Sequence, residues 1–225
     1  MAKKIIILLF LLTFPSVLYV ILSTGKTHFI HLQFYGEKKL APNGKDTIYQ
    51  TIAPFKLINQ DGETITNNTF DHKIYVASYF FSDCNSIVCQ KITTELLRVQ
   101  EKFMYISDNV KILSHTMKPE QDSVSQLKKF STLVHSDCKM WNFVTGDKKQ
   151  LADLAKDNYM LFTSKPNGKP NDSLIHNERL VLIDKEKHIR GFYDGSNIKE
   201  VNNLLDDIKV LLAEYYIIEN EKKKK

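Results

Sequence analysis

Two of the three cysteines, Cys84 and Cys89, lie in a stretch that joins a strand-like run to a helix-like run. Residues 74–80 before them are β-branched and aromatic, which is typical of a buried parallel strand. Apolar residues then recur at helical spacing over residues 92–103. Unpaired N–H groups and the helix dipole at a helix start favour a thiolate and lower the pKa of a thiol. Such a thiol can attack a disulfide or bind a soft metal.

The spacing of the two cysteines constrains their placement. Residues five apart on a regular helix differ by about 140° and do not share a face. A disulfide needs Cα atoms within about 4.4–6.8 Å, and a shared metal needs similar convergence. We therefore expect Cys84 in the loop, or an extra-residue bulge in the first turn. Asp83, next to Cys84, opposes the effect of the dipole. A structural disulfide, or two inert buried thiols, is the alternative to a reactive pair.

The length and charge of the chain limit the classes of function. With 225 residues, the chain has room for one ordinary domain with a full core. The net charge is +5, but basic and acidic residues nearly balance once the six lysines near the two termini are set aside. The charge pattern therefore argues against a nucleic-acid surface.

An uncharged apolar segment, residues 5–22, follows Lys3 and Lys4. As a helix it would be about 27 Å long, which is close to the hydrocarbon thickness of a bilayer. No A-x-A-like site follows, so we expect a transmembrane anchor, or an uncleaved signal, rather than a cleaved signal peptide. The positive-inside rule leaves residues 1–4 as a cytoplasmic stub and places the domain on the extracytoplasmic, periplasmic side of the inner (cytoplasmic) membrane. In that oxidising compartment a thiol pair forms a disulfide unless a reductant serves it.

The rest of the chain divides into a tether over residues 23–50, one domain over residues 51–218 and a lysine-rich, solvated tail over residues 219–225. Within the domain, residues 52–66 are typical of a hairpin, and Pro54 predicts that its first strand lies at a sheet edge. Residues 163–172 predict an exposed loop. The further predicted elements are a strand over 110–116, a helix from Asp122, a helix capped by Asp147, a hairpin of 180–184 with 189–193, and an amphipathic helix over 201–215.

This order of strands and helices calls for a parallel sheet with right-handed crossovers. A hairpin, then βαβα, then ββα, with two cysteines after the first parallel strand, is the thioredoxin arrangement. In detail the chain resembles the SCO/SenC family of membrane-anchored thioredoxin-fold proteins. The fragments that carry the resemblance are Pro54-Phe55 with Asn59-Gln60-Asp61-Gly62, Phe80-Phe81-Ser82-Asp83-Cys84 with Cys89, Leu113-Ser114-His115-Thr116 with Lys118-Pro119-Glu120-Gln121-Asp122, Trp141 with Val144-Thr145-Gly146-Asp147, and Ile175-His176 with Leu182-Ile183-Asp184-Lys185.

The resemblance implies an α/β, thioredoxin-like fold with a central mixed sheet flanked by helices, an N-terminal hairpin and one N-terminal membrane helix. It also implies a copper site, for Cu(I) or Cu(II), made by Cys84, Cys89 and His176. Two thiolates and an imidazole are soft donors that suit copper, and zinc would accept them but prefers a fourth ligand. The implied function is copper delivery to the copper-site subunit of cytochrome c oxidase, with a thioredoxin-like reductant serving the cysteines.

Two other functions are compatible with the same residues. An extracytoplasmic thiol-disulfide oxidoreductase needs no obligatory metal, and in it Cys84 attacks and Cys89 resolves the mixed disulfide. An adhesive or scaffolding domain would keep the disulfide as a staple. The chain also departs from the family pattern, because four residues rather than three separate the cysteines, and Asn85 and Gln90 replace prolines.

Three further residues could take part in the site. Cys138 could offer a fourth thiolate, although its position on a connecting segment favours a free or buried cysteine. His115, at the end of a predicted parallel strand, is either an accessory group at the sheet edge or a packed core residue. His188 lies in a predicted hairpin turn, where we expect it to be solvated.

Overall fold

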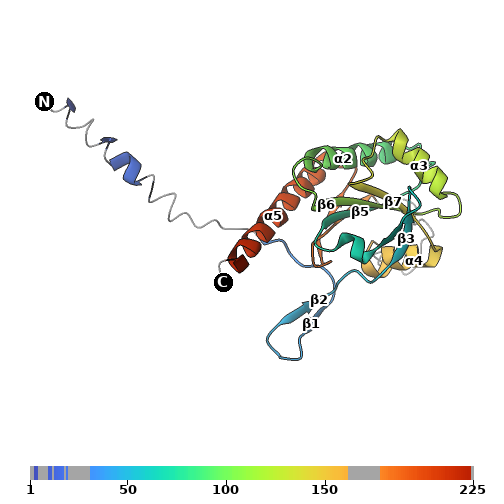
Figure 1. Ribbon diagram of the computed structural model, residues 1–225, viewed down its shortest axis with the longest axis horizontal. Coiled ribbons are helices and arrows are strands. Elements are labelled where there is room, and N and C mark those ends of the chain that lie inside the picture. The colour runs from blue at the N-terminus through green and yellow to red at the C-terminus, as the bar shows by residue number, and fades with distance from the viewer. Residues whose placement is uncertain are drawn as a thin grey trace, which may run out of the picture. The chain divides into compact units, whose positions relative to one another are not determined.

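A seven-stranded mixed sheet forms the centre of the domain in the computed structural model (Figure 1). The structure describes residues 3–4, 10–11, 13–17, 19, 31–161 and 178–223. The sheet order is β4-β3-β7-β6-β5-β8-β9, in which β5, β6 and β7 are parallel and β3 and β8 join them antiparallel. The bounds are β3 Lys56–Asn59, β4 Thr64–Thr66, β5 Ile74–Phe80, β6 Val110–Thr116, β7 Trp141–Thr145, β8 Arg179–Ile183 and β9 Ile189–Asp194.

Helices cover both faces of the sheet, because side chains alternate between the faces along each strand. On β5, Ile74 and Val76 face a core formed with α2, α3 and α5, whereas Tyr75 and Ala77 face a second core formed with α4 and the π-helical turn after it. The bounds are η1 Asn67–Phe70, α2 Ile87–Phe103, α3 Val124–Leu133, α4 Lys148–Asp153, η2 Leu154–Asn158 and α5 Ile198–Lys223. This arrangement confirms the predicted thioredoxin-like α/β fold with a central mixed sheet.

The predicted edge position of the first hairpin strand is wrong. β3 lies between β4 and β7, and the edge strand is β4. Pro54 precedes β3, which begins at Lys56, so its missing N–H removes no hydrogen bond from the ladder. A proline outside the strand therefore places no limit on the position of the strand in the sheet.

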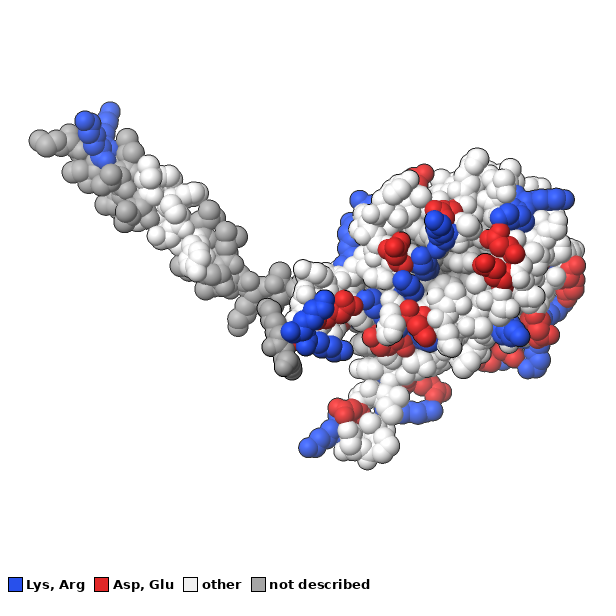
Figure 2. All heavy atoms as spheres, viewed as in Figure 1, with Lys and Arg blue, Asp and Glu red and all other residues white. Residues whose placement is uncertain are grey.

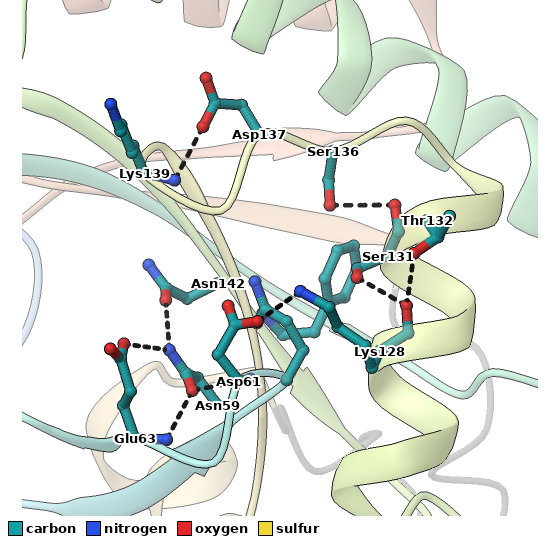
Figure 3. Close-up of polar contacts among 12 residues, drawn as sticks. Asn59, Asp61, Glu63, Lys128, Ser131, Thr132, Ser136, Asp137, Lys139 and Asn142 are labelled. Atoms are coloured by element: carbon teal, nitrogen blue, oxygen red, sulfur yellow. Dashed lines mark hydrogen bonds and ion pairs between the residues drawn. The ribbon is translucent and has the colours of Figure 1, made fainter.

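The turn between β3 and β4 is organised by one buried side chain, Asn59 (Figure 3). Its carbonyl oxygen accepts hydrogen bonds from the backbone N–H groups of Asp61 and Glu63, and its amide donates to Asn142 Oδ1 at 3.1 Å. Lys128 of α3 forms an ion pair with Asp61. These contacts fasten the hairpin to β7 and α3.

The segment from Leu32 onward contacts the domain, although residues 23–50 were predicted as a tether. Tyr35 pairs with Ile189 at the outer edge of β9, and the Arg190 guanidinium donates to the carbonyl oxygen of Leu32 at 2.9 Å. Arg190 is buried, so it requires acceptors of this kind. A small antiparallel sheet of β1 Lys38–Leu40 and β2 Thr47–Tyr49 completes this segment.

The chain divides into two compact units, residues 1–31 and 32–225. In the part of the chain that the structure describes, no helix has the length and apolar character needed to cross a membrane. The predicted anchor, residues 5–22, includes positions outside the described residues, and the predicted loop over residues 163–172 lies entirely outside them. On the visible face of the domain, Lys and Arg side chains are interspersed with Asp and Glu side chains (Figure 2).

Candidate redox and metal site

Cys84 and Cys89 form a disulfide at the junction between β5 and α2, with Cα atoms 6.2 Å apart. Cys84 lies in the connection before the helix, and Cys89 is the third residue of α2. The first of the two predicted arrangements, with Cys84 in the loop, is therefore the one observed. No bulge is needed, because only one cysteine belongs to the helix.

Ser86 sets the boundary between the loop and the helix. Its backbone is extended, and its side-chain oxygen accepts a hydrogen bond from the N–H of Cys89 at 3.1 Å, which caps α2. The same oxygen lies 3.4 Å from Cys84 Sγ. One hydroxyl thus contacts both halves of the cysteine pair, so the start of the helix is built around the disulfide.

A cavity of about 370 Å³ adjoins the disulfide, and both cysteines line it. Aromatic side chains form part of its walls, including Phe80, Phe81, Phe130 and Phe143. Both cysteines are half-buried. The sulfur atoms are therefore accessible beside an apolar surface.

The charge of Asp83 beside Cys84 is balanced by Lys118. The two side chains form an ion pair at 3.0 Å, and the Lys118 ammonium also lies 4.3 Å from the centre of the Phe81 ring. Both charged groups are substantially exposed, so solvent screens them. The predicted opposition between Asp83 and the helix dipole is accordingly reduced by a neighbouring cation.

His115 is a core residue on the face of the sheet opposite α2. Its ring is fully buried and stacks on Tyr79 with 4.8 Å between ring centres. Nδ1 lies 3.2 Å from the carbonyl oxygen of Ser78, which can only accept, so Nδ1 carries the proton and Nε2 accepts from the Tyr159 hydroxyl at 3.5 Å. Burial lowers the pKa of His115 to about 4. These contacts match the packing interpretation rather than an accessory role.

Cys138 is an exposed free cysteine. It precedes β7 and so lies at the amino end of the parallel strands, whereas Cys84 follows the carboxyl end of β5. Because parallel strands have the same direction, the two cysteines lie at opposite ends of the sheet. Cys138 is therefore not positioned as a fourth ligand beside Cys84 and Cys89.

His176, predicted as the third copper ligand, lies outside the described residues.

His188 is not solvated as predicted, because its ring packs against Phe34 and Tyr49 in the turn after β8. His188, Glu186 and Asp184 bring possible ligand atoms within 4.8 Å of one another.

The oxygens of Asp184 in that cluster are already engaged. Oδ1 accepts from the backbone N–H groups of Glu186 and His188, and Oδ2 forms an ion pair with buried Arg190 at 3.0 Å. The guanidinium supplies the positive charge that a metal would bring. The contacts of Asp184 therefore stabilise the turn between β8 and β9 and do not form a metal site.

Asp122 is a site residue that sequence reasoning missed. The sequence predicted it as the start of a helix, but Ser123 caps α3 and Asp122 is buried with its carboxylate bound to Ser82, two residues before Cys84. The one available signal was the adjacency of two capping residues, Asp122 and Ser123, of which a helix uses only one as its cap.

The fold and the cysteine pair define a class: a thioredoxin-like protein whose disulfide joins the loop after the first parallel strand to the following helix. A family model described as SCO1/SenC matches residues 44–213, and the chain belongs to this family. It is 26% identical over 166 residues to the SCO1 protein homolog of Bacillus subtilis (strain 168). The aligned region covers 73% of this chain and 84% of the relative.

Two solved structures extend the comparison. BsSco, a member of the Sco family of cytochrome c oxidase assembly proteins in which a disulfide switch was identified, aligns with a TM-score of 0.61 and 25% identity, over 72% of this chain and 92% of that chain. ScoI of Bradyrhizobium japonicum with copper bound aligns with a TM-score of 0.57 and 17% identity, over 72% of this chain and 99% of that chain. The second likeness shows the shared fold.

Proposed function

We propose that this chain is a membrane-tethered copper chaperone that binds copper through Cys84, Cys89 and His176 and delivers it during assembly of the cytochrome c oxidase copper site. The observation that carries the proposal is the cysteine pair, which converges at an accessible point beside the cavity. The SCO1/SenC family membership, the oxidase-assembly class of BsSco and the copper bound to a ScoI relative support it.

The two sulfur atoms fit copper in number and chemistry. Reduction of the disulfide gives two thiols, which lose their protons when they bind a metal. Two thiolates and one imidazole form a soft site of low coordination number, which suits Cu(I) and allows transfer by stepwise ligand exchange. Residues 5–22 would anchor the domain to the inner membrane on its periplasmic side, next to the copper-site subunit of the oxidase, and a thioredoxin-like reductant would keep the cysteines reduced.

Copper titration tests this function. The reduced domain should bind one equivalent of Cu(I), and both Cys84→Ser and Cys89→Ser should abolish tight binding. His176→Asn should weaken binding strongly, whereas the matched control His135→Asn should not, because His135 is exposed and its positive φ of 54° suits asparagine. Copper binding by the His176 variant as tight as by the parent would reject His176 as a ligand.

A thiol-disulfide oxidoreductase is the second candidate, favoured by the position of Cys84 outside the helix and beside the cavity. The Cys84 thiolate would attack a partner disulfide, forming one S–S bond and releasing one partner thiolate. The Cys89 thiolate would then attack Cys84 Sγ, release the second partner thiolate and restore the Cys84–Cys89 disulfide. The partner gains two electrons, and the cysteine pair loses two.

Trapping separates this reaction from copper binding. In the oxidoreductase, Cys89→Ser should accumulate a mixed disulfide with a model disulfide substrate, because the resolving sulfur is absent, and Cys84→Ser should not. The assay is run with a copper chelator present. Equal trapping by the two variants, or none by either, would contradict the assigned roles.

A further inference from the structure

Asp122 is a buried carboxylate whose contacts converge on the loop that carries Cys84. Only 1% of the residue is exposed. Oδ1 accepts a hydrogen bond from the Ser82 hydroxyl, and Oδ2 accepts one from the Ser82 backbone N–H at 3.3 Å and one from the Thr116 hydroxyl. Both oxygens of one side chain therefore bind the same loop residue, and one of them also binds the end of β6.

The contact at Ser82 fixes the turn that contains Cys84. The Cys84 N–H donates to the carbonyl oxygen of Phe81 at 3.2 Å, so Ser82 lies inside this turn. The Met117 N–H donates to the carbonyl oxygen of Phe80 at 2.8 Å, which continues the pairing of β5 with β6 up to the turn. Beyond the point where this backbone pairing ends, the hydrogen bonds of Asp122 to Ser82 link the loop to the segment after β6.

Asp122 has no role in the helix that follows it. It does not cap α3, because the Ser123 hydroxyl accepts from the Gln126 N–H. Within residues 31–161 and 178–223, Asp122 forms no ion pair with a basic side chain. A buried carboxylate is costly unless its oxygens are hydrogen-bonded, and here the donors come from the loop and from the end of β6.

We propose that Asp122 is a positioning residue that, through Ser82, holds Cys84 at the distance from Cys89 at which the disulfide forms. This inference rests on the proposed function, in which the cysteine pair is the working group. The Cα atoms of the pair are 6.2 Å apart, toward the upper end of the usual range of about 4.4–6.8 Å. A loop released from Asp122 spends less time within this range, so the reduced dithiol is favoured.

The test is the equilibrium between the cysteine pair and a glutathione redox buffer, measured with the whole protein and no copper. Asp122→Asn keeps the shape of the side chain, but it leaves one acceptor oxygen in place of two. We expect the equilibrium to shift about tenfold toward the dithiol, which is about 30 mV for a two-electron couple. Ser82→Ala should shift it in the same direction. The matched control is Glu120→Gln, an exposed change in the same segment, which should leave it unchanged.

A double-mutant cycle distinguishes positioning from a general loss of stability. If Asp122 acts through Ser82, the shift in the double variant is clearly smaller than the sum of the two single shifts. Additive shifts, or an equilibrium within twofold of the parent in both single variants, would overturn the inference. If Asp122→Asn does not fold, Ser82→Ala decides alone. Copper titration of the parent tests the proposed function separately, so the two failures are distinguishable.

Discussion

Two aspartates with the same 1% exposure, Asp122 and Asp184, occupy regions that use a buried carboxylate differently. Asp184 holds the turn between β8 and β9, and its charge is met by the buried guanidinium of Arg190. Asp122 holds the cysteine loop, which is the connection over residues 81–86 between β5 and α2 that carries Cys84. The Asp122 carboxylate accepts hydrogen bonds from the hydroxyls of Ser82 and Thr116 and from the backbone N–H of Ser82.

The difference between the two regions lies in what each carboxylate connects. Through Arg190, Asp184 is linked to the carbonyl oxygen of Leu32 and to Glu214 of α5, so its region joins permanent parts of the fold. Asp122 connects the fold to a loop whose covalent state changes when the disulfide opens. Loss of Asp184 should therefore reduce stability without altering the cysteines, and loss of Asp122 should alter the cysteines.

The largest expected effect is that of Asp184→Ala. It leaves Arg190 buried without its closest counter-charge, and breaking a buried ion pair costs about 3–5 kcal/mol. Urea unfolding should show this loss, while the disulfide equilibrium with glutathione stays at the parent value. Asp206→Ala is the control, because it removes an exposed ion pair with Lys209 and should cost less than about 1 kcal/mol. If Asp184→Ala shifted the disulfide equilibrium, the conclusion that only the Asp122 region acts on the cysteines would be wrong.

The next effect is the dependence of stability on pH that comes from the buried side chain of His115. His115 has a pKa of about 4 in the folded protein, below its ordinary value of 6.5, so the unfolded state binds more protons between these values. Its contribution is present above pH 6.5 and is lost as the pH falls toward 4, by about 3 kcal/mol. Urea unfolding from pH 7 to pH 4 measures the loss.

His115→Gln supplies the control for this pH dependence. The variant is less stable at pH 7, but its stability should decline less between pH 7 and pH 4, since the group that takes up the proton on unfolding is absent. Parallel pH profiles for parent and variant would show that His115 does not carry this dependence.

A smaller effect is expected at the two helix caps. Ser86→Ala and Ser123→Ala each remove an N-cap hydroxyl, of α2 and α3 respectively, and should each cost about 1 kcal/mol. Only Ser86 also contacts Cys84, so only Ser86→Ala should change the rate at which dithiothreitol reduces the disulfide. The same change of rate in both variants would mean that helix stability, rather than the hydroxyl, controls the cysteines.

The smallest effect is expected from Lys118→Gln, which removes the exposed partner of Asp83. Reduction by glutathione, whose attacking thiolate carries further negative charge, should slow by about two- to threefold at low salt, and reduction by mercaptoethanol, whose thiolate carries a single charge, should slow less. The difference should disappear at high salt. Lys148→Gln is the control, because its exposed partner Glu120 does not contact the cysteine loop. Slowing that stays the same at high salt would exclude an electrostatic cause.

The sequence predicted what depends on local pattern. The strand over residues 110–116 has the predicted bounds, and Asp147 caps α4 by accepting from the Gln150 N–H. Cys84 in the loop was one of two predicted arrangements, because helical geometry leaves few arrangements for two cysteines at this spacing, and it is the one observed. Each of these predictions uses only residues that are close together in the chain.

Errors arose where distant residues decide. The position of β3 in the sheet depends on its pairing with β7, which follows it by more than eighty residues. Asp122 binds Ser82, 40 positions away, so no local pattern shows that its carboxylate turns toward the cysteine loop. His188 is covered by Phe34 from the N-terminal segment, a contact that the composition of a hairpin turn does not reveal.

The unequal placement of the two sulfur atoms has a mechanical consequence. Cys89 belongs to a helix of seventeen residues packed on the sheet, whereas Cys84 belongs to the short connection over residues 81–86. When the S–S bond opens, we expect the helix to keep its packing and the connection to take up most of the displacement. A partner protein can then distinguish the oxidised from the reduced form by the shape of one small surface loop, against a background that stays constant.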